Sequence, residues 1–532
     1  MTQEKLSNTK FLLVLALLTS VLISVIYANS LTDQFSFDDY GLIVENKGIR
    51  DIKNLKEVLF HSLRIPQRPV TSLSFAVDYF FWGLSPEGYH LSNIIYYILS
   101  CIAFTLLVHL IFERRLITVL FAIFFSTHPI HTETVSSLLG RSDLLSAIFL
   151  SLGLIFYFYF GKNEEKKKIN YYFLSLISYL CAMLSKETGI ILPGIIILYD
   201  YCFRKDFKLS KSFLPYIPFF SCAILYILYW KSLPSSTAVS LVFAELTLSQ
   251  RLIIMVKVIA KYTVLLFFPV NLCGWYNLSH LNSFFNLRFL ISLIIATILI
   301  VLPIVYRKSK QFLFFLLWAY LGFLPVSNII PIPGSRMSER WIYITSAGFC
   351  VLLALSIERL LEKKSLRIIS YWLIAAIALF FCIRTSERNP TFRNNISIFQ
   401  DIARCCTDFA PAYNSLGVAL LMEEEYQPAI ENFNKSLKLY PEYDRPHYNL
   451  GKIYMIQEKG QKALSEFLKA SKSKPEQSEY RYWLALAYER TGENKNALTE
   501  YKEFLKLSKK DDPRTKKVKL LIEKYSNGKE KL

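Results

Sequence analysis

Two adjacent carboxylates, Asp38 and Asp39, follow the first long apolar stretch of the chain. One carboxylate there can accept a proton from an attacking hydroxyl group, and two together can hold a divalent cation. Other polar and ionisable residues recur beside later apolar stretches, where such groups are candidates for function. They are Arg68, His90, Asn93, His128, His131, Glu133, Arg141, Asp143, Lys186, Glu187, Glu339 and Arg340.

The basic members of this set suit a phosphate leaving group, because Arg and Lys can neutralise its charge and Arg can hold it with a bidentate fork. They are Arg68, Arg141, Lys186 and Arg340. Neither GxGxxG nor GxxxxGK[ST] occurs, so a phosphorylated donor is expected to arrive already attached to lipid. Paired carboxylates and histidines also suit Mg²⁺ or Mn²⁺, but a fixed cation balances phosphate as well, so the sequence does not require a metal. Taken singly, Arg141 with Asp143 could be a local ion pair, Lys186 with Glu187 a snorkelling pair, and His128 a helix cap.

The composition indicates a polytopic membrane protein. Of 532 residues, 53% are hydrophobic and 15% aromatic, and apolar runs of about 18 residues recur. The net charge of +19 is explained by basic cytoplasmic loops and does not indicate nucleic-acid binding. Nine scattered cysteines without a CxxC spacing favour structural roles.

Basic clusters predict the topology. Lys5 and Lys10 precede the first span, about 10–29, so the N-terminus is expected to be cytoplasmic. A cleaved signal peptide is the alternative, disfavoured by the missing cleavage site. Residues 30–90 then form an external loop with short helices on the membrane surface. The stretch 251–268, which carries three basic residues, is expected to be an amphipathic surface helix. About 11 spans result, with the polar turns and the C-terminal region on the extracytoplasmic side.

After Arg384 the composition becomes polar, and positions repeat every 34 residues. Small residues recur in two columns and an aromatic residue in a third: Gly417, Gly451 and Ala485; Ala429, Ala463 and Ala497; Phe433, Phe467 and Tyr501. This is the tetratricopeptide-repeat (TPR) pattern. The predicted chain is all-α: a membrane domain over 1–386, a linker over 387–409, three repeats over 410–511 and a capping helix or tail over 512–532. Such solenoids bind extended peptides, although a structural or dimerising role is the alternative.

Several motifs occur together and in order. They are Phe37-Asp38-Asp39, Arg68 to Phe75, Gly88 to Asn93, His128 to Glu133, Gly140 to Asp143, Ser185-Lys186-Glu187, Pro193 with Tyr199-Asp200, and Ser338 to Tyr343. With the repeats behind them, they resemble the transmembrane and tetratricopeptide-repeat-containing proteins, a group of protein O-mannosyltransferases of the GT-C fold. The chain is short for the animal members, so a bacterial member that uses undecaprenyl phosphate and another sugar is one interpretation.

The resemblance implies a GT-C membrane glycosyltransferase that transfers mannose or another hexose, with inversion, from a polyprenyl-phosphate donor. The acceptor would be a hydroxyl group, most simply Ser or Thr of a polypeptide held by the repeats, although a glycan or lipid acceptor stays open. By position, Asp38 matches the catalytic base and Asp39 its acidic neighbour. The protein would lie in the inner membrane of a bacterium or the endoplasmic reticulum of a eukaryote. A non-enzymatic membrane scaffold that works through its repeats is the alternative, and a transporter a minor one.

Overall fold

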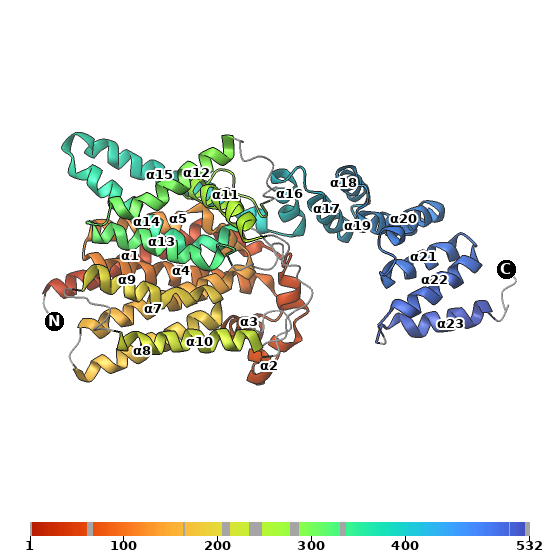
Figure 1. Cartoon of the computed structure of the whole chain (residues 1–532), viewed down its shortest axis with the longest axis horizontal. Helices are drawn as coiled ribbons and strands as arrows, with labels where there is room; N and C mark the ends of the chain where they lie inside the picture. Colours follow the sequence, from red (N-terminus) through yellow and green to blue (C-terminus); the bar gives the residue numbers. More distant parts are fainter. Residues whose placement is uncertain are drawn as a thin grey trace. The chain divides into compact units, whose positions relative to one another are not determined.

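The computed structural model describes residues 3–60, 68–162, 165–204, 213–232, 247–276, 287–329, 337–509 and 511–526. Every regular element in these ranges is a helix, which confirms the predicted all-α class. The chain divides into two compact units, Met1–Ser397 and Ile398–Leu532 (Figure 1).

Long apolar helices that lie side by side make up the first unit (Figure 1). The α-helices are α1 (Gln3–Ile26), α2 (Leu55–Phe60), α3 (Pro69–Trp82), α4 (Pro86–Phe112), α5 (Arg115–Thr127), α6 (Thr132–Ser136), α7 (Arg141–Lys162), α8 (Glu165–Ser185), α9 (Leu192–Phe203), α10 (Ile217–Ser232), α11 (Leu248–Phe267), α12 (Leu287–Val305), α13 (Lys310–Phe323), α14 (Tyr343–Glu362) and α15 (Arg367–Arg388). Short turns connect them, among them η1 (Ala28–Thr32), the π-helical η2 (Tyr40–Val44), η3 (Lys47–Ile49), η6 (Glu187–Ile191) and η10 (Glu339–Ile342).

Seven helical segments of the described chain are long and apolar enough to cross a membrane: Ser7–Ile26, Pro86–Phe112, Leu138–Lys162, Leu214–Ser232, Leu287–Val305, Glu339–Glu362 and Lys364–Phe392. Two shorter apolar helices, Arg115–Thr127 and Lys310–Val326, accompany them. The chain is therefore a multi-pass membrane protein, but the predicted count of about 11 spans is not confirmed.

Helix α11 occupies the stretch expected to be amphipathic. Thr247 and Gln250 form a capping box at its start, in which each side chain satisfies a backbone N–H group of the first turn. One face of α11 is buried through residues such as Met255 and Val258. Its position relative to the membrane surface stays a prediction.

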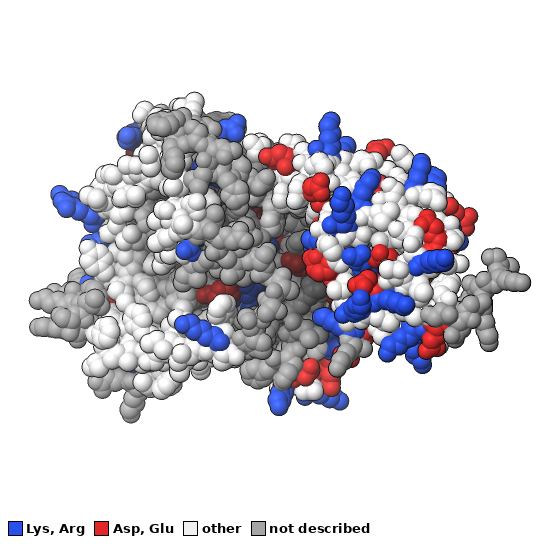
Figure 2. Space-filling view, turned by 45° about the vertical axis from the view of Figure 1, so that its right-hand side comes forward, with Lys and Arg blue, Asp and Glu red and all other residues white. Residues whose placement is uncertain are grey.

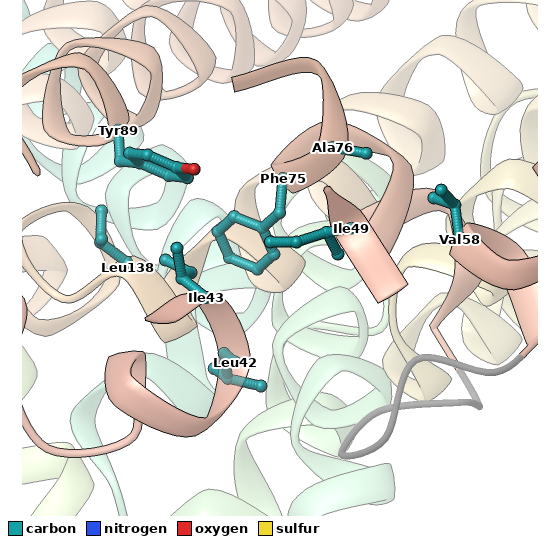
Figure 3. Packing of buried hydrophobic residues seen from close by; sticks show 8 residues of the cluster. All are labelled: Leu42, Ile43, Ile49, Val58, Phe75, Ala76, Tyr89 and Leu138. Carbon is teal, nitrogen blue, oxygen red and sulfur yellow. The ribbon is translucent and has the colours of Figure 1, made fainter. Parts of the chain in front are cut away.

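A small apolar cluster holds the segment after α1 against the bundle. Leu42 and Ile43 of η2 pack with Phe75 of α3, Tyr89 of α4 and Leu138 before α7 (Figure 3). Full burial of such side chains stabilises a fold by about 1.5–3 kcal/mol each. The acidic pair immediately precedes η2, so this cluster fixes its position.

The second unit consists of paired helices, and the segment expected to be a linker contains η12 (Asn389–Phe392) and α16 (Asn395–Cys405). The pairs are α17 (Ala410–Met422) with α18 (Tyr426–Leu439), α19 (Asp444–Ile456) with α20 (Gly460–Ser473), and α21 (Ser478–Arg490) with α22 (Asn494–Leu507), followed by α23 (Arg514–Ser526). A Cβ atom on Gly417 would lie 2.6 Å from the Phe433 ring, and one on Gly451 would lie 2.7 Å from Phe467. The repeating columns therefore mark where the two helices of a pair touch. Charged side chains cover the face of this unit seen in Figure 2, whereas that of the membrane unit is mostly uncharged.

Candidate functional site

The acidic pair lies in a tight turn. The Asp39 carboxylate accepts a hydrogen bond from the Ser36 amide at 2.9 Å, and the Asp39 amide donates to the Ser36 carbonyl at 2.9 Å. Phe37 between them has a φ of +48°, a left-handed conformation that costs a non-glycine residue energy. Its amide donates to Asn395 Oδ1 at 2.6 Å, so contacts from a distant segment hold the turn in place.

The two carboxylates of the pair have different surroundings. Asp39 is 2% exposed, and its burial raises the pKa from 3.8 to about 7, with the Ser36 hydrogen bonds opposing the rise. Asp38 is half-buried, and its carbonyl accepts from the Leu42 amide at 3.0 Å, beside the π-helical turn η2. Asp39 thus shapes the turn, whereas Asp38 is the more accessible acid.

Three ion pairs connect the predicted cations to predicted carboxylates. Arg68 binds Glu187 in a bidentate fork, with Nε–Oε2 and Nη2–Oε1 distances of 3.1 and 2.9 Å. Lys186 Nζ lies 2.5 Å from Asp143 Oδ1, and both side chains are 3% exposed.

The third pair joins Arg340 and Glu133. Arg340 donates from Nη1 to Glu133 Oε1 at 2.7 Å and from its amide to Oε2 at 3.1 Å. Ser338 Oγ also donates to Glu133 Oε1, at 2.7 Å. Glu133 therefore fixes both the backbone and the side chain of Arg340.

The first turn of α7 brings the three cations together. Ser142 Oγ accepts from Arg68 Nη1 at 3.3 Å, and the next residue, Asp143, holds Lys186. The charges of Arg68, Lys186 and Arg340 all act on Asp143. The structure thus gathers three cations, each paired with a carboxylate. They are Arg68 before α3, Lys186 before η6 and Arg340 in η10, and are called the cationic cluster below.

Arg141, the fourth predicted phosphate ligand, lies inside the core. It is fully buried, pairs with Asp78, and donates from Nε to Asn93 Oδ1 at 2.7 Å and from Nη2 to the Tyr89 carbonyl at 2.9 Å. Its guanidinium also lies over the Phe75 ring, 4.4 Å from the centroid. This geometry favours a positioning role for Arg141 over direct contact with a phosphate.

Asn93 and the histidines are likewise buried. The Asn93 amide donates to the carbonyls of the α6 segment at 3.1 and 3.2 Å. His128 accepts from the Ile130 amide at 3.2 Å through Nδ1, and His131 bridges Tyr97 at 2.9 Å and Ser346 at 2.7 Å. The contacts of Asn93 and His131 tie helices to each other, whereas the bond from Ile130 to His128 caps the local turn. His90 is 1% exposed, and neither ring nitrogen has a hydrogen-bond partner in the described chain.

Glu339 lies next to Arg340 but belongs to another network. Its Oε1 accepts from the Cys273 amide at 2.5 Å and from the Tyr276 hydroxyl at 2.6 Å. Arg388 Nη2 lies 3.8 Å from the same oxygen. Glu339 therefore connects the chain after α11 with the end of α15.

Tyr226 was not expected from the sequence. It lies on α10, its hydroxyl is buried without a hydrogen-bond partner in the described chain, and it is within electrostatic reach of Arg68 and Glu187. No sequence motif surrounds it, because it is one of many aromatic residues in an apolar stretch. Its inward direction could be found only from the structure.

Comparison with known proteins adds a family context. Tetratricopeptide-repeat models match residues 410–443 and 448–512. The second unit is a tetratricopeptide-repeat domain. Over 84% of its length the chain is 25% identical to the protein O-mannosyl-transferase TMTC3 of Mus musculus, and over 81% it is 28% identical to the protein O-mannosyl-transferase F38B6.6 of Caenorhabditis elegans. The human protein O-mannosyl-transferase TMTC1 is 24% identical over 78%. These relatives confirm the predicted resemblance.

The chain spans only part of these relatives: 53% of the mouse protein, 63% of the nematode protein and 54% of human TMTC1. Among solved structures, a crystal structure of MamA aligns with 31% of this chain and 90% of its own, at 23% identity and a TM-score of 0.21. A TM-score this low carries no argument about fold or function.

Proposed function

We propose that this chain is a membrane glycosyltransferase that moves mannose, or another hexose, from a polyprenyl-phosphate donor to an acceptor hydroxyl group with inversion. The observation that carries the proposal is the cationic cluster, whose three members lie beside one turn of α7. Similarity to proteins named protein O-mannosyl-transferases supports the same reaction class. We place the reaction on the extracytoplasmic side, with the N-terminus in the cytoplasm.

In the proposed reaction, Asp38 accepts the proton of the acceptor hydroxyl group as its oxygen bonds to the anomeric carbon. The bond from that carbon to the phosphate oxygen breaks, and polyprenyl phosphate leaves with the bonding electrons. We assign the base to Asp38 because its side chain is half-buried and can be reached by an acceptor, whereas Asp39 is 2% exposed and its carboxylate accepts from the Ser36 amide. General base catalysis of this kind contributes about 10²–10⁴-fold.

The cationic cluster would stabilise the leaving phosphate. Arg68 and Arg340 keep 20% and 22% of their side chains exposed, so a phosphate can reach them. Lys186 is buried with Asp143, so it would act on the phosphate through its charge without direct contact. The Tyr226 hydroxyl could donate a hydrogen bond to the same phosphate.

The acceptor is proposed to be a polypeptide presented by the repeat domain, since repeats of this type bind extended peptides. A divalent cation stays a sequence prediction: within the described first unit, no three His, Cys, Asp or Glu side chains bring ligand atoms within 4.8 Å of one another.

The proposal is tested by assaying the purified chain with polyprenyl-phosphate mannose and an acceptor peptide. Arg68→Gln and Tyr226→Phe are expected to raise KM for the donor and weaken binding of sugar-free polyprenyl phosphate. Arg114→Gln is the matched control: Arg114 also pairs with a carboxylate, Glu358 at 2.7 Å, but it follows the far end of α4, about 40 Å along that helix from its start. Equal donor binding by Arg68→Gln and wild type would contradict the phosphate site. A scaffold would show neither transfer nor donor binding.

A further inference from the structure

Helix α3 ends in a group of exposed apolar side chains, Phe80, Phe81, Trp82 and Leu84, here called the aromatic tip. Phe80 and Phe81 are 64% and 68% exposed, and Trp82 and Leu84 are 43% and 42% exposed. The two phenylalanine rings pack edge to face, with their centroids 5.1 Å apart. Apolar groups gathered in this way on a surface mark an interaction site.

The tip is held rigidly. Gly83, with a φ of +58°, ends the helix in a conformation that glycine adopts without strain. The Tyr89 hydroxyl, from α4, donates to the Gly83 carbonyl at 2.8 Å. Tyr89 itself lies in the buried cluster of Figure 3. The exposed rings therefore stand on a fixed turn.

The tip continues a stripe on α4 that faces away from the bundle. The Trp82 ring lies on Gly88, where a Cβ atom would be 2.2 Å from the ring. Counting three, seven and eleven residues onward from Gly88 gives Leu91, Ile95 and Leu99, which share its helix face. All three are exposed, at 38%, 47% and 46%. Since α4 is a candidate span, this stripe faces lipid, and the aromatic tip extends it at the end of the span.

We propose that the aromatic tip inserts into the interfacial layer of the bilayer, at the end of the bundle that carries the candidate site. Trp and other aromatic rings favour this layer, where an apolar ring meets lipid headgroups. The exposed carboxylate of Glu87, in the first turn of α4, lies close to the tip in sequence and belongs in water. Glu87 limits the depth of insertion to the interface.

Insertion would also fix the height of Arg68 relative to the lipid headgroups. Arg68 lies immediately before α3, and the aromatic tip lies at the other end of this helix. The 14 residues of α3 place the two about 20 Å apart. Thr71 of α3 is tied to the Ser185 carbonyl at 2.9 Å, so the helix is anchored near the cationic cluster. This consequence for donor binding rests on the proposed function, whereas insertion itself does not.

The insertion is tested with p-benzoylphenylalanine at Phe81, in the full chain reconstituted in phosphatidylcholine nanodiscs and irradiated. A lipid adduct is expected in a yield comparable with that from the same probe at Leu99, which faces lipid. The probe at Tyr440, 54% exposed in the repeat domain, is expected to give at least tenfold less. An adduct at Leu99 without one at Phe81 would overturn the proposal.

A second measurement addresses the consequence for the donor. Phe80→Ser with Phe81→Ser is expected to raise the donor KM several-fold with little change in kcat, while detergent-solubilised protein shows a smaller difference. If wild type binds no polyprenyl phosphate, the proposed function fails but the crosslinking result stands. If wild type binds donor and the double variant has an unchanged KM in nanodiscs, the link from the tip to donor binding is refuted.

Discussion

Asp39→Asn should stabilise the protein at high pH, although Asp39 belongs to the candidate site. Burial raises the pKa of this carboxyl from 3.8 to about 7, so ionisation is less favourable in the folded chain than in the unfolded one. The contribution of Asp39 to the free energy of unfolding is therefore most favourable below pH 4, where the carboxyl is protonated in both states. This contribution is lost as the pH rises through 7. Each pKa unit corresponds to about 1.4 kcal/mol, which makes the penalty at pH 8 up to roughly 4 kcal/mol. Asparagine carries no charge, and its carbonyl can still accept from the Ser36 amide.

The measurement is thermal unfolding of the purified protein in detergent at pH 5, 6, 7 and 8. The gain from Asp39→Asn over wild type should grow from pH 5 to pH 7 and change little more by pH 8. Asp33→Asn is a matched variant, because Asp33 is 1% exposed, its carboxylate oxygens have no hydrogen-bond partner in the described chain, and burial also raises its pKa to about 7. The two variants should therefore show similar pH dependence.

Only Asp39 lies in the turn that carries Asp38, directly beside the proposed base, so Asp39→Asn alone should alter sugar transfer. An Asp39→Asn protein that is no more stable than wild type at pH 8, or that gains equally at pH 5 and pH 8, would refute the reasoning. The first result would mean that the carboxylate is solvated or paired, and the second that the effect is unrelated to its ionisation.

Three further outcomes are expected. Asp38→Asn should fold and bind donor but lower kcat by about 10²–10⁴-fold; transfer at the wild-type rate would remove Asp38 as the base. Lys186→Met should lower the free energy of unfolding by about 3–5 kcal/mol, because Asp143 would be left buried and unpaired; adding Asp143→Asn should restore stability but not transfer, as thermal unfolding and activity assays can show. Gly451→Val should destabilise the repeat domain by about 1–3 kcal/mol, since its first added atom would meet the Phe467 ring; limited proteolysis of the full chain should detect this, and unchanged resistance would contradict the packing argument.

The repeat domain could be predicted from sequence because its constraint is local. Gly417 and Phe433 meet within one helical pair, only 16 positions apart, and the same contact recurs at Gly451 and Phe467. A spacing pattern records such a contact directly. The membrane unit offers no comparable repetition, and its short helices α5 and α13, of 13 and 14 residues, fall below the length that marks a span. The span count therefore could not be fixed by hydrophobic runs.

The residue types at the candidate site were also predictable, but their partners were not. Arg68 and Glu187 are 119 positions apart, and Arg340 and Glu133 are 207 apart, so no spacing rule connects them. Closeness in sequence did not identify the partners either. Arg141 lies two positions from Asp143, but it pairs with Asp78 in the core. An arginine in the core and an arginine near a ligand look alike in sequence because both require a carboxylate.

One turn of α7 explains why a buried core arginine directly precedes the residues that contact the cationic cluster. Arg141 reaches back to the helices behind it, Ser142 contacts Arg68, and Asp143 holds Lys186. The turn starts at Gly140, where a Cβ atom would lie 2.2 Å from the Thr134 carbonyl oxygen, so a larger residue would displace all three. A fully satisfied arginine thus serves the site by fixing the serine and aspartate that follow it. Loss of Arg141 should therefore disturb donor binding through the position of the cations, even though its own guanidinium stays out of reach of the phosphate.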